Sequence, residues 1–530
     1  MRLSKPRPKA TSHSVTRAAV GMGGVTLVSR LAGFLRVLVI AAVLGTTYLG
    51  NTFQAANSVS NVLFELLAAG ALSAVLVPTF VTLVDAGRDD EADRLANGLL
   101  GYALAAMGVI TVLGIAFAPL LARLLSSGAP NAHVGAEQRH LATFLLWFFV
   151  PQVLLYAFGA IATGLLYARR QFSITAAAPI GSSVVMIGCF VAFRVLAGAS
   201  PTFHLTLNEK LLLAIAGSGG VVGFVGILMI AAWRAGFSVR PRWDRRDPEL
   251  RRFTRLAVWG VLLHSGAAML LGASLVAGNG VAGGVVAYQV AFTFFLAPYA
   301  VLAQPIHTAI LPRMSNDVAA GDLDAFAHSV RWALDRMALL VVPVSAGLVV
   351  IALPMMRLVA FGSAAKTGPV LLGAGMASLA LGLYPYGAFL LLARSYYALG
   401  ESRTPAIVAI GTAIVGMVVM IVGSHVTHGA ARVAALGIGH TTAYAIGVVI
   451  LGVGCRRRTG RSLVPMLLPV SVAISSVIAF VAWLAIRALD PSGRLATAAC
   501  LAVVGAVGTG VYALAVRRWW RAPALAGSGV

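Results

Sequence analysis

The chain alternates long apolar runs with short polar breaks from Gly21 to Arg518. The hydrocarbon core of a bilayer is ~30 Å thick and a helix rises about 1.5 Å per residue, so ~20 apolar residues span it. About fourteen runs reach this length. Charged residues make up only 11% of the chain, whereas a soluble domain carries about 25%. The pattern therefore predicts an all-α, polytopic membrane protein.

The first run is longer than the apolar part of a signal peptide, which has about 7–15 residues, so we expect it to remain as the first helix. An even number of helices would place both termini on one side of the membrane. The predicted helices cover 20–44, 51–83, 95–121, 141–166, 174–197, 210–233, 253–277, 283–310, 334–360, 368–394, 404–424, 430–454, 463–487 and 495–516.

Positive charge sets the predicted orientation. The net charge is +23, but Lys and Arg lie in the breaks between apolar runs, which argues against a nucleic-acid partner. Alternate breaks, counted from the N-terminus, carry roughly three times as many basic residues as the others, and such breaks face the cytoplasm. We therefore expect a multi-pass protein of the bacterial cytoplasmic (inner) membrane with both termini in the cytoplasm.

The most basic break lies near the middle of the chain and suggests two six-helix lobes. It has two interpretations: a topology signal with general attraction to anionic headgroups, or a specific landing site for an acidic lipid headgroup. The predicted organisation is a basic tail (1–17), an N-terminal lobe (18–233), a basic linker (234–252), a C-terminal lobe (253–454), two further helices (455–518) and a C-terminal tail (519–530).

A weak internal repeat supports two lobes. Segment 159–179 resembles segment 387–405: each has a Gly-Ala start, an aromatic residue, a basic exit and a proline that opens the next helix. Repeated halves are common in transporters, which bind their substrate between the halves.

Polar side chains lie along one face of the predicted second helix. Lipid cannot satisfy their hydrogen bonds, so this face contacts either other helices, as a hydrogen-bonded seam, or a hydrated cavity, which we favour. Helical spacing brings six polar residues to this face: Asn51, Gln54, Asn57, Ser58, Asn61 and Glu65.

The first predicted helix carries two arginines, Arg30 and Arg36. Ionisable groups inside a membrane are costly and face a partner or a cavity. Arg36 lies near mid-span, so it either pairs with Glu65 or binds an anionic ligand, and its guanidinium fork suits phosphate oxygens.

The eighth predicted helix has a thinner polar stripe. Pro298 and Pro305 interrupt it, and such breaks are tolerated where the backbone lines a cavity. His264 in the seventh helix could join the same wall, although an isolated histidine inside a membrane is more often a packing residue. The stripe contains Gln289, Thr293, Gln304 and His307.

Several motifs resemble the MurJ/MviN family of lipid II flippases, part of the multidrug/oligosaccharidyl-lipid/polysaccharide (MOP) exporter superfamily. The resemblance covers about Arg17 to Arg518. The motifs are Ser29–Arg36 (SRLAGFLR), Asn57–Ser73, Val77–Phe80 (VPTF), Arg170–Phe172 with Pro179, Ile310–Ser315 (ILPRMS) and Ala393–Pro405.

The resemblance implies fourteen helices, two lobes in a V shape, alternating access, and a cationic central cavity that holds the pyrophosphate of a lipid-linked peptidoglycan precursor. Ser29, Arg30, Arg36 and Asn61 match the family pattern. The family typically has charged residues at positions occupied here by Val37, Asn51, Phe64, Phe292, Thr293 and Leu296.

The leading hypothesis is a transporter, not an enzyme, that moves lipid II or a close undecaprenyl-pyrophosphate-linked precursor. Arg36 with Arg30 would attract pyrophosphate, and Gln54, Asn57, Asn61 and Thr293 would hydrogen-bond sugar or peptide groups. The alternatives are a divergent exporter of another lipid-linked glycan and a non-transporting scaffold for cell-wall synthesis. A membrane glycosyltransferase is a weaker option, because the predicted outer loops carry few acids.

No cofactor is expected. The sequence has no Gly-x-x-x-x-Gly-Lys-[Ser/Thr] motif for nucleotide binding. Cys189, Cys455 and Cys500 are far apart and have no metal-ligand spacing. The expected partners are the lipid-linked peptidoglycan precursor, membrane lipids and, for a scaffold, cell-wall synthesis proteins.

Overall fold

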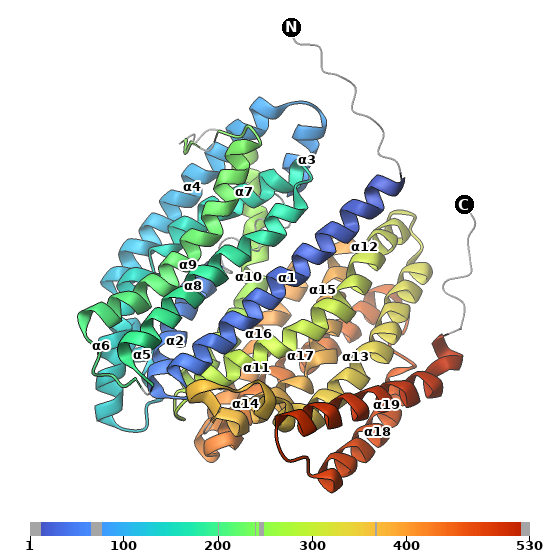
Figure 1. Ribbon diagram of the computed structural model, residues 1–530. Helices are drawn as coiled ribbons and strands as arrows, with labels where there is room; N and C mark the ends of the chain where they lie inside the picture. The colour runs from blue at the N-terminus through green and yellow to red at the C-terminus, as the bar shows by residue number, and fades with distance from the viewer. Residues whose placement is uncertain are drawn as a thin grey trace.

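The computed structural model is helical in all of its regular secondary structure, within the residues it describes (Figure 1). It describes 12–64, 77–199, 201–238, 240–242, 248–365 and 368–520, without the side chains of 12–23, 64, 77–79, 248–261 and 520. Glu65, most of both predicted tails and part of the predicted linker therefore lie outside the described residues.

Eleven helices in the described ranges are long and apolar enough to cross a membrane, and a pair bent by 43°, Gly368–Ala380 with Leu383–Ala398, would make twelve. The other two predicted runs, 51–83 and 253–277, are helical where the structure describes them. The all-α polytopic fold is confirmed, whereas the count of fourteen stays a prediction.

The N-terminal helices form one bundle, which lies on the left in Figure 1. Its apolar core gathers around fully buried Phe53, Phe149 and Phe190. Its helices are α1 (Ser12–Leu44), α2 (Tyr48–Phe64), α3 (Val77–Asp85), α4 (Asp89–Ala116), α5 (Ala118–Leu125), α6 (Ala132–Phe149), α7 (Gln152–Ala168), α8 (Phe172–Ala197) and α9 (Leu207–Arg234).

The following helices form a second bundle, and the last two pack on its α13 (Figure 1). The break between α9 and α10 coincides with the predicted basic linker. The exact boundaries of the linker and of the two lobes remain predictions. The helices are α10 (Pro248–Gly278), α11 (Gly284–Pro298), η3 (Tyr299–Ala303), α12 (Gln304–Ala319), α13 (Leu323–Val359), η4 (Gly362–Ala365), α14 (Gly368–Ala380), α15 (Leu383–Ala398), α16 (Arg403–Val426), α17 (Gly429–Thr459), α18 (Leu468–Leu489) and α19 (Arg494–Trp520).

The turn after α7 and the turn after α15 have the same backbone geometry. After α7, Arg170 has φ +60° and Gln171 N donates to Leu166 O at 2.9 Å. After α15, Gly400 has φ +76° and Glu401 N donates to Tyr396 O at 2.9 Å. Both turns are left-handed helix caps, in the segments whose sequences resemble each other.

Near Pro298 and Pro305, where a break was predicted, the helix is irregular but continuous, and residues 284–319 form one span. Between α11 and α12 the chain forms one π-helical turn, η3, and Pro305 lies in the first turn of α12. π-Helical turns inside α-helices occur frequently at functional sites. The turn lies within the C-terminal bundle, where Tyr299 and Ala303 are buried.

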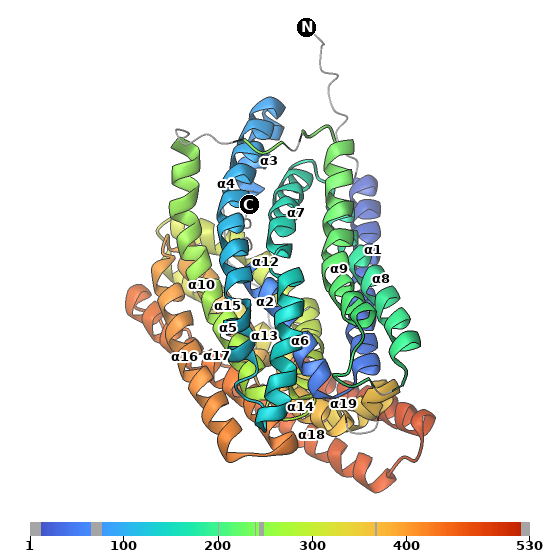
Figure 2. The ribbon, with the colours of Figure 1, turned by 90° about the vertical axis from the view of Figure 1, so that its left-hand side faces the viewer.

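The bundles meet at one end, where α1 passes into α2 and α10 into α11; we call it the closed end, and it lies at the bottom of Figure 1 and Figure 2. A Cβ atom added to Gly283 would lie 2.3 Å from the Cα of Thr46. Only glycine therefore allows these two segments of the chain to approach so closely. Ser363 Oγ donates to Ala199 O at 2.9 Å across the same end. We call the opposite end, with the turns after α7 and α15, the loop end.

Candidate functional site

A buried amide network joins the two bundles at the closed end. It consists of Asn51 on α2, Gln138 on α6 and Asn279 after α10, which are 0%, 2% and 3% exposed. Gln138 Nε2 donates to Asn279 Oδ1 and Asn279 Nδ2 donates to Gln138 Oε1, both at 2.8 Å. Asn51 Nδ2 donates to Asn279 Oδ1 at 3.2 Å. Buried amides whose partners lie on two bundles hold these bundles together.

Asn51 also caps a helix of the other bundle. Its Oδ1 accepts from the backbone N–H groups of Val285 and Val286, at 3.1 and 3.4 Å, in the first turn of α11. The residue before that helix is Gly283, which has no side chain to supply a cap. Asn51 was predicted as cavity wall, but in this conformation it is sealed inside the interface.

The polar face of α2 changes character along the helix. Gln54 and Ser58 are 7% and 6% exposed, and Gln289 of α11 donates to Ser58 Oγ at 3.3 Å. Asn57, which lies between Gln54 and Ser58, is partly buried, and Asn61, nearer the loop end, is exposed. The half of the face nearer the loop end is therefore accessible, as a cavity wall requires.

Arg36 lies opposite this accessible half, inside the N-terminal bundle. It is partly buried, and its Nη1 donates to Ser182 Oγ of α8 at 3.0 Å. Tyr156 of α7 lies close enough to Arg36 for electrostatic interaction and donates from its hydroxyl to Asn61 Oδ1 at 2.9 Å. These four residues form what we call the arginine cluster. Within the described residues, the hydrogen-bond partner of the guanidinium is the neutral Ser182 hydroxyl, and none of their carboxylates pairs with it.

The remaining predicted residues do not form one wall. Thr293 is partly buried and bonds to its own helix at Gln289 O, 3.0 Å. Gln304 is exposed, whereas His307 is fully buried against Tyr299 and Met337. In this conformation His307 is a packing residue.

Two predicted residues stand apart from the arginine cluster. Arg30 is exposed on α1, and His264 is partly buried on α10. Neither belongs to the arginine cluster. Glu65, the predicted alternative partner of Arg36, lies outside the described residues.

An aromatic cluster surrounds Phe292 in the C-terminal bundle. The ring centroid of Phe292 lies 5.6 Å from that of Phe295 and 5.6 Å from that of His440. Tyr386 packs edge-on against Phe295 at 5.3 Å. Stacked and edge-on ring pairs stabilise such a cluster.

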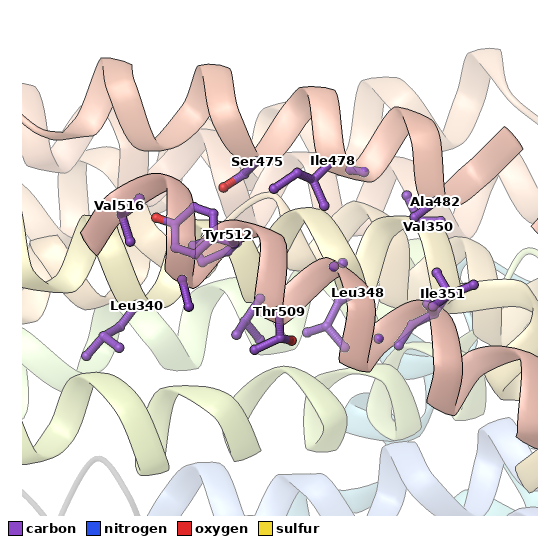
Figure 3. Close-up of a pocket in the computed structure, with 18 of the residues that line it drawn as sticks. Leu340, Leu348, Val350, Ile351, Ser475, Ile478, Ala482, Thr509, Tyr512 and Val516 are labelled. Carbon is purple, nitrogen blue, oxygen red and sulfur yellow. The ribbon is translucent and has the colours of Figure 1, made fainter. Parts of the chain in front are cut away.

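An apolar cavity of about 610 Å³ lies between α13, α18 and α19 (Figure 3). Leu348, Ile351 and Ile478 line it, and Arg517 lies at its edge. Tyr512 is anchored by a 2.8 Å hydrogen bond to Ser471. A cavity of this size and lining suits a hydrocarbon chain.

Four important partners were not predicted: Ser182, Tyr156, Gln138 and Asn279. Each is an ordinary polar residue within or next to an apolar helix, and each contact joins helices far apart in the chain. Ser182 is 146 residues from Arg36, and Asn279 is 228 residues from Asn51. Asn279 had one signal, its position at the break between two predicted helices.

Comparisons with known proteins agree with this architecture. A family model described as lipid II flippase MurJ matches residues 40–501. A probable lipid II flippase MurJ of Rhizobium tropici is 26% identical over 394 residues, which cover 74% of this chain and 72% of the relative. The lipid II flippase MurJ of Burkholderia cenocepacia is 25% identical over 405 residues, covering 75% and 76%.

Solved structures are similar in fold. A lipid II flippase MurJ in an inward closed conformation has a TM-score of 0.72 at 18% identity and covers 94% of this chain and 99% of its own. An inward-facing MATE family transporter of the MOP superfamily has a TM-score of 0.64 at 14% identity, covering 83% and 98%. The family match spans most of the sequence, and the chain therefore belongs to the MurJ family of lipid II flippases.

Proposed function

We propose that this chain moves lipid II, an undecaprenyl-pyrophosphate-linked peptidoglycan precursor, across the bacterial cytoplasmic membrane by alternating access. It is a transporter rather than an enzyme. The observation that carries the assignment to specific residues is the arginine cluster, a cation at bilayer depth beside the accessible face of α2. The family membership supplies the substrate class.

In the proposed mechanism, Arg36 attracts the pyrophosphate, because a guanidinium pairs well with phosphate oxygens in a low-dielectric site. Ser182 orients the guanidinium and leaves its charge available to the ligand. Asn57 and Asn61 hydrogen-bond polar groups of the head. Opening of the closed end then requires the amide network between the bundles to break.

The test is lipid II translocation in vesicles that contain the purified chain. Arg36→Ala should lower the rate by about tenfold to a hundredfold, the loss expected when a charged hydrogen bond to substrate is removed. Arg194→Ala, which removes a partly buried arginine of α8 that bonds to Gly198 O, should keep the wild-type rate. Equal rates for Arg36→Ala and wild type would remove Arg36 from the site. A wild-type chain that moves another lipid-linked glycan but not lipid II would support the divergent exporter.

The substrate also has a long hydrocarbon tail, and we propose that the apolar cavity of Figure 3 receives part of it. Gly505 and Gly510 of α19 provide matched positions, because a Cβ atom added to either would meet open space. Of these two glycines, only Gly505 lines the cavity. Gly505→Leu should slow translocation severalfold and Gly510→Leu should not. Equal rates for the two variants would exclude the cavity as the tail site.

A further inference from the structure

A second cavity lies at the loop end of the C-terminal bundle, far in sequence from the arginine cluster. It measures about 510 Å³ and is bounded by α15, α16 and α17. Its wall on α17 consists of Val449, Ile450 and Val453, which are 63%, 45% and 46% exposed. Exposed aliphatic side chains on a membrane-spanning helix face lipid, so this wall is positioned to contact an acyl chain.

Tyr396 of α15 lies at the floor of the cavity. Tyr396 is fully buried, and its hydroxyl donates to Leu451 O at 3.1 Å. A Cβ atom added to Gly454 would lie 2.3 Å from the Tyr396 hydroxyl oxygen. Glycine at this position therefore lets the tyrosine lie beneath α17 and keeps the groove open above it.

Two arginines close one end of the cavity. Arg457 and Arg458 follow Val453 and Gly454 by four residues, so helical spacing puts their charges at the end of the apolar wall. Arg458 is held in place by an ion pair with Glu401, a 3.4 Å hydrogen bond to Thr404 and the ring of Tyr396, whose centroid lies 4.8 Å away.

The balance of charge leaves this end cationic. Arg457 is exposed and makes no ion pair or hydrogen bond with the described residues. Among the described residues, Glu401 is the only carboxylate that forms an ion pair with an arginine of this cavity, and its partner is Arg458. Arg456 adds a further positive charge in the same turn of α17.

We propose that this cavity binds an acidic phospholipid, with the phosphate on Arg457 and Arg458 and one acyl chain along Val449, Ile450 and Val453. Arginine matches phosphate geometry, and basic pockets between helices on the cytoplasmic side bind acidic headgroups. A free phosphate ion would use only the two arginines and would leave the aliphatic wall uncovered. The wall therefore favours the lipid. The site is separate from the proposed lipid II site.

The experiment measures lipid binding by native mass spectrometry of the full chain in detergent, with phosphatidylglycerol and phosphatidylcholine added in turn. Wild type should retain phosphatidylglycerol in preference to phosphatidylcholine. Arg457→Gln should weaken phosphatidylglycerol binding about fivefold to tenfold, and Arg457→Lys should recover part of the loss. Because this readout does not involve translocation, its failure is distinguishable from failure of the proposed function.

Arg456→Gln is the matched control, since it removes the same charge one residue away and does not line the cavity. Equal loss of binding in Arg456→Gln and Arg457→Gln would mean diffuse attraction and would overturn the proposal, as would unchanged binding in Arg457→Gln. If inorganic phosphate at millimolar concentration displaced the lipid completely, the cavity would be a site for free phosphate, and the proposal of a lipid site would be wrong. Thermal unfolding of each variant verifies that the fold is intact.

Discussion

The two ends of helix α2 carry the same residue type in opposite settings. Asn51 is fully buried and bonds to residues of the other bundle, whereas Asn61, about 15 Å along the helix, is exposed and bonds to Tyr156 within its own bundle. The sequence gives both as asparagines on one polar face. The difference teaches that such a face can serve as a seam at one end and as an accessible wall at the other.

The contrast suits a protein that works by alternating access. A transporter needs one end of the bundle interface sealed while polar groups nearer the other end remain open to substrate. A network of neutral amides can seal an interface without a buried charge, which avoids the desolvation cost of ions. Here the seal and the proposed substrate contacts lie on one helix.

The largest expected effect comes from Asn51→Leu. This change removes the acceptor of the N–H groups of Val285 and Val286 and one hydrogen bond to Asn279, and each buried orphaned group costs about 1–3 kcal/mol. Asn61→Leu, at an exposed position, loses only the hydrogen bond from Tyr156 and should cost no more than about 0.5–1.5 kcal/mol. Thermal unfolding in detergent measures both, and similar losses in the two variants would contradict the comparison.

A second variant sharpens the test at the same position. Asn51→Asp keeps an acceptor for the N-terminus of α11, where the helix dipole favours negative charge. It loses the donor to Asn279 and to Val281 O. We expect its loss of stability to lie between those of wild type and Asn51→Leu.

Chemical labelling should resolve the two settings directly. In a chain whose Cys189, Cys455 and Cys500 are replaced by alanine, Ala55→Cys and Asn61→Cys each introduce one thiol on α2. Ala55 is 4% exposed, so its label requires opening of the closed end. A membrane-permeant maleimide should react at least about tenfold more slowly at position 55, which corresponds to an opening free energy above about 1.4 kcal/mol. Equal rates would mean that this end is not closed.

The smallest effect is expected for Tyr156→Phe, which removes one hydrogen bond to an exposed partner, Asn61. Such a bond contributes about 0.5–1.5 kcal/mol, so lipid II translocation should fall by less than about tenfold. Tyr167→Phe is a control on the same helix, because its hydroxyl makes no hydrogen bond with the described residues. If Tyr156→Phe lowered the translocation rate as much as Arg36→Ala, Tyr156 would contact the substrate directly.

Much of the fold was predictable because its causes are local. Apolar runs long enough to span a bilayer form the observed helices, and the prolines near 298 and 305 mark the π-helical turn. The weak repeat between 159–179 and 387–405 corresponds to two turns with the same left-handed cap. The count of fourteen spans was not confirmed.

The candidate site was predictable only in part. Arg36 and the polar face of α2 stand out because charged and amide groups are rare inside apolar helices. Their partners do not stand out, since Ser182, Tyr156 and Gln138 look like ordinary helix residues. Phe292 illustrates a different case: the sequence shows an apolar residue in a helix, and only the structure reveals that it packs against Phe295 and His440.

The sequence alone determined that this chain crosses the membrane many times and carries a cation and a polar face at bilayer depth, because hydropathy and helical period act over neighbouring residues. Tertiary structure decided which asparagine seals the bundles and which stays accessible. That decision depends on helices more than a hundred residues apart in the chain, whose hydrogen bonds form only after they pack side by side.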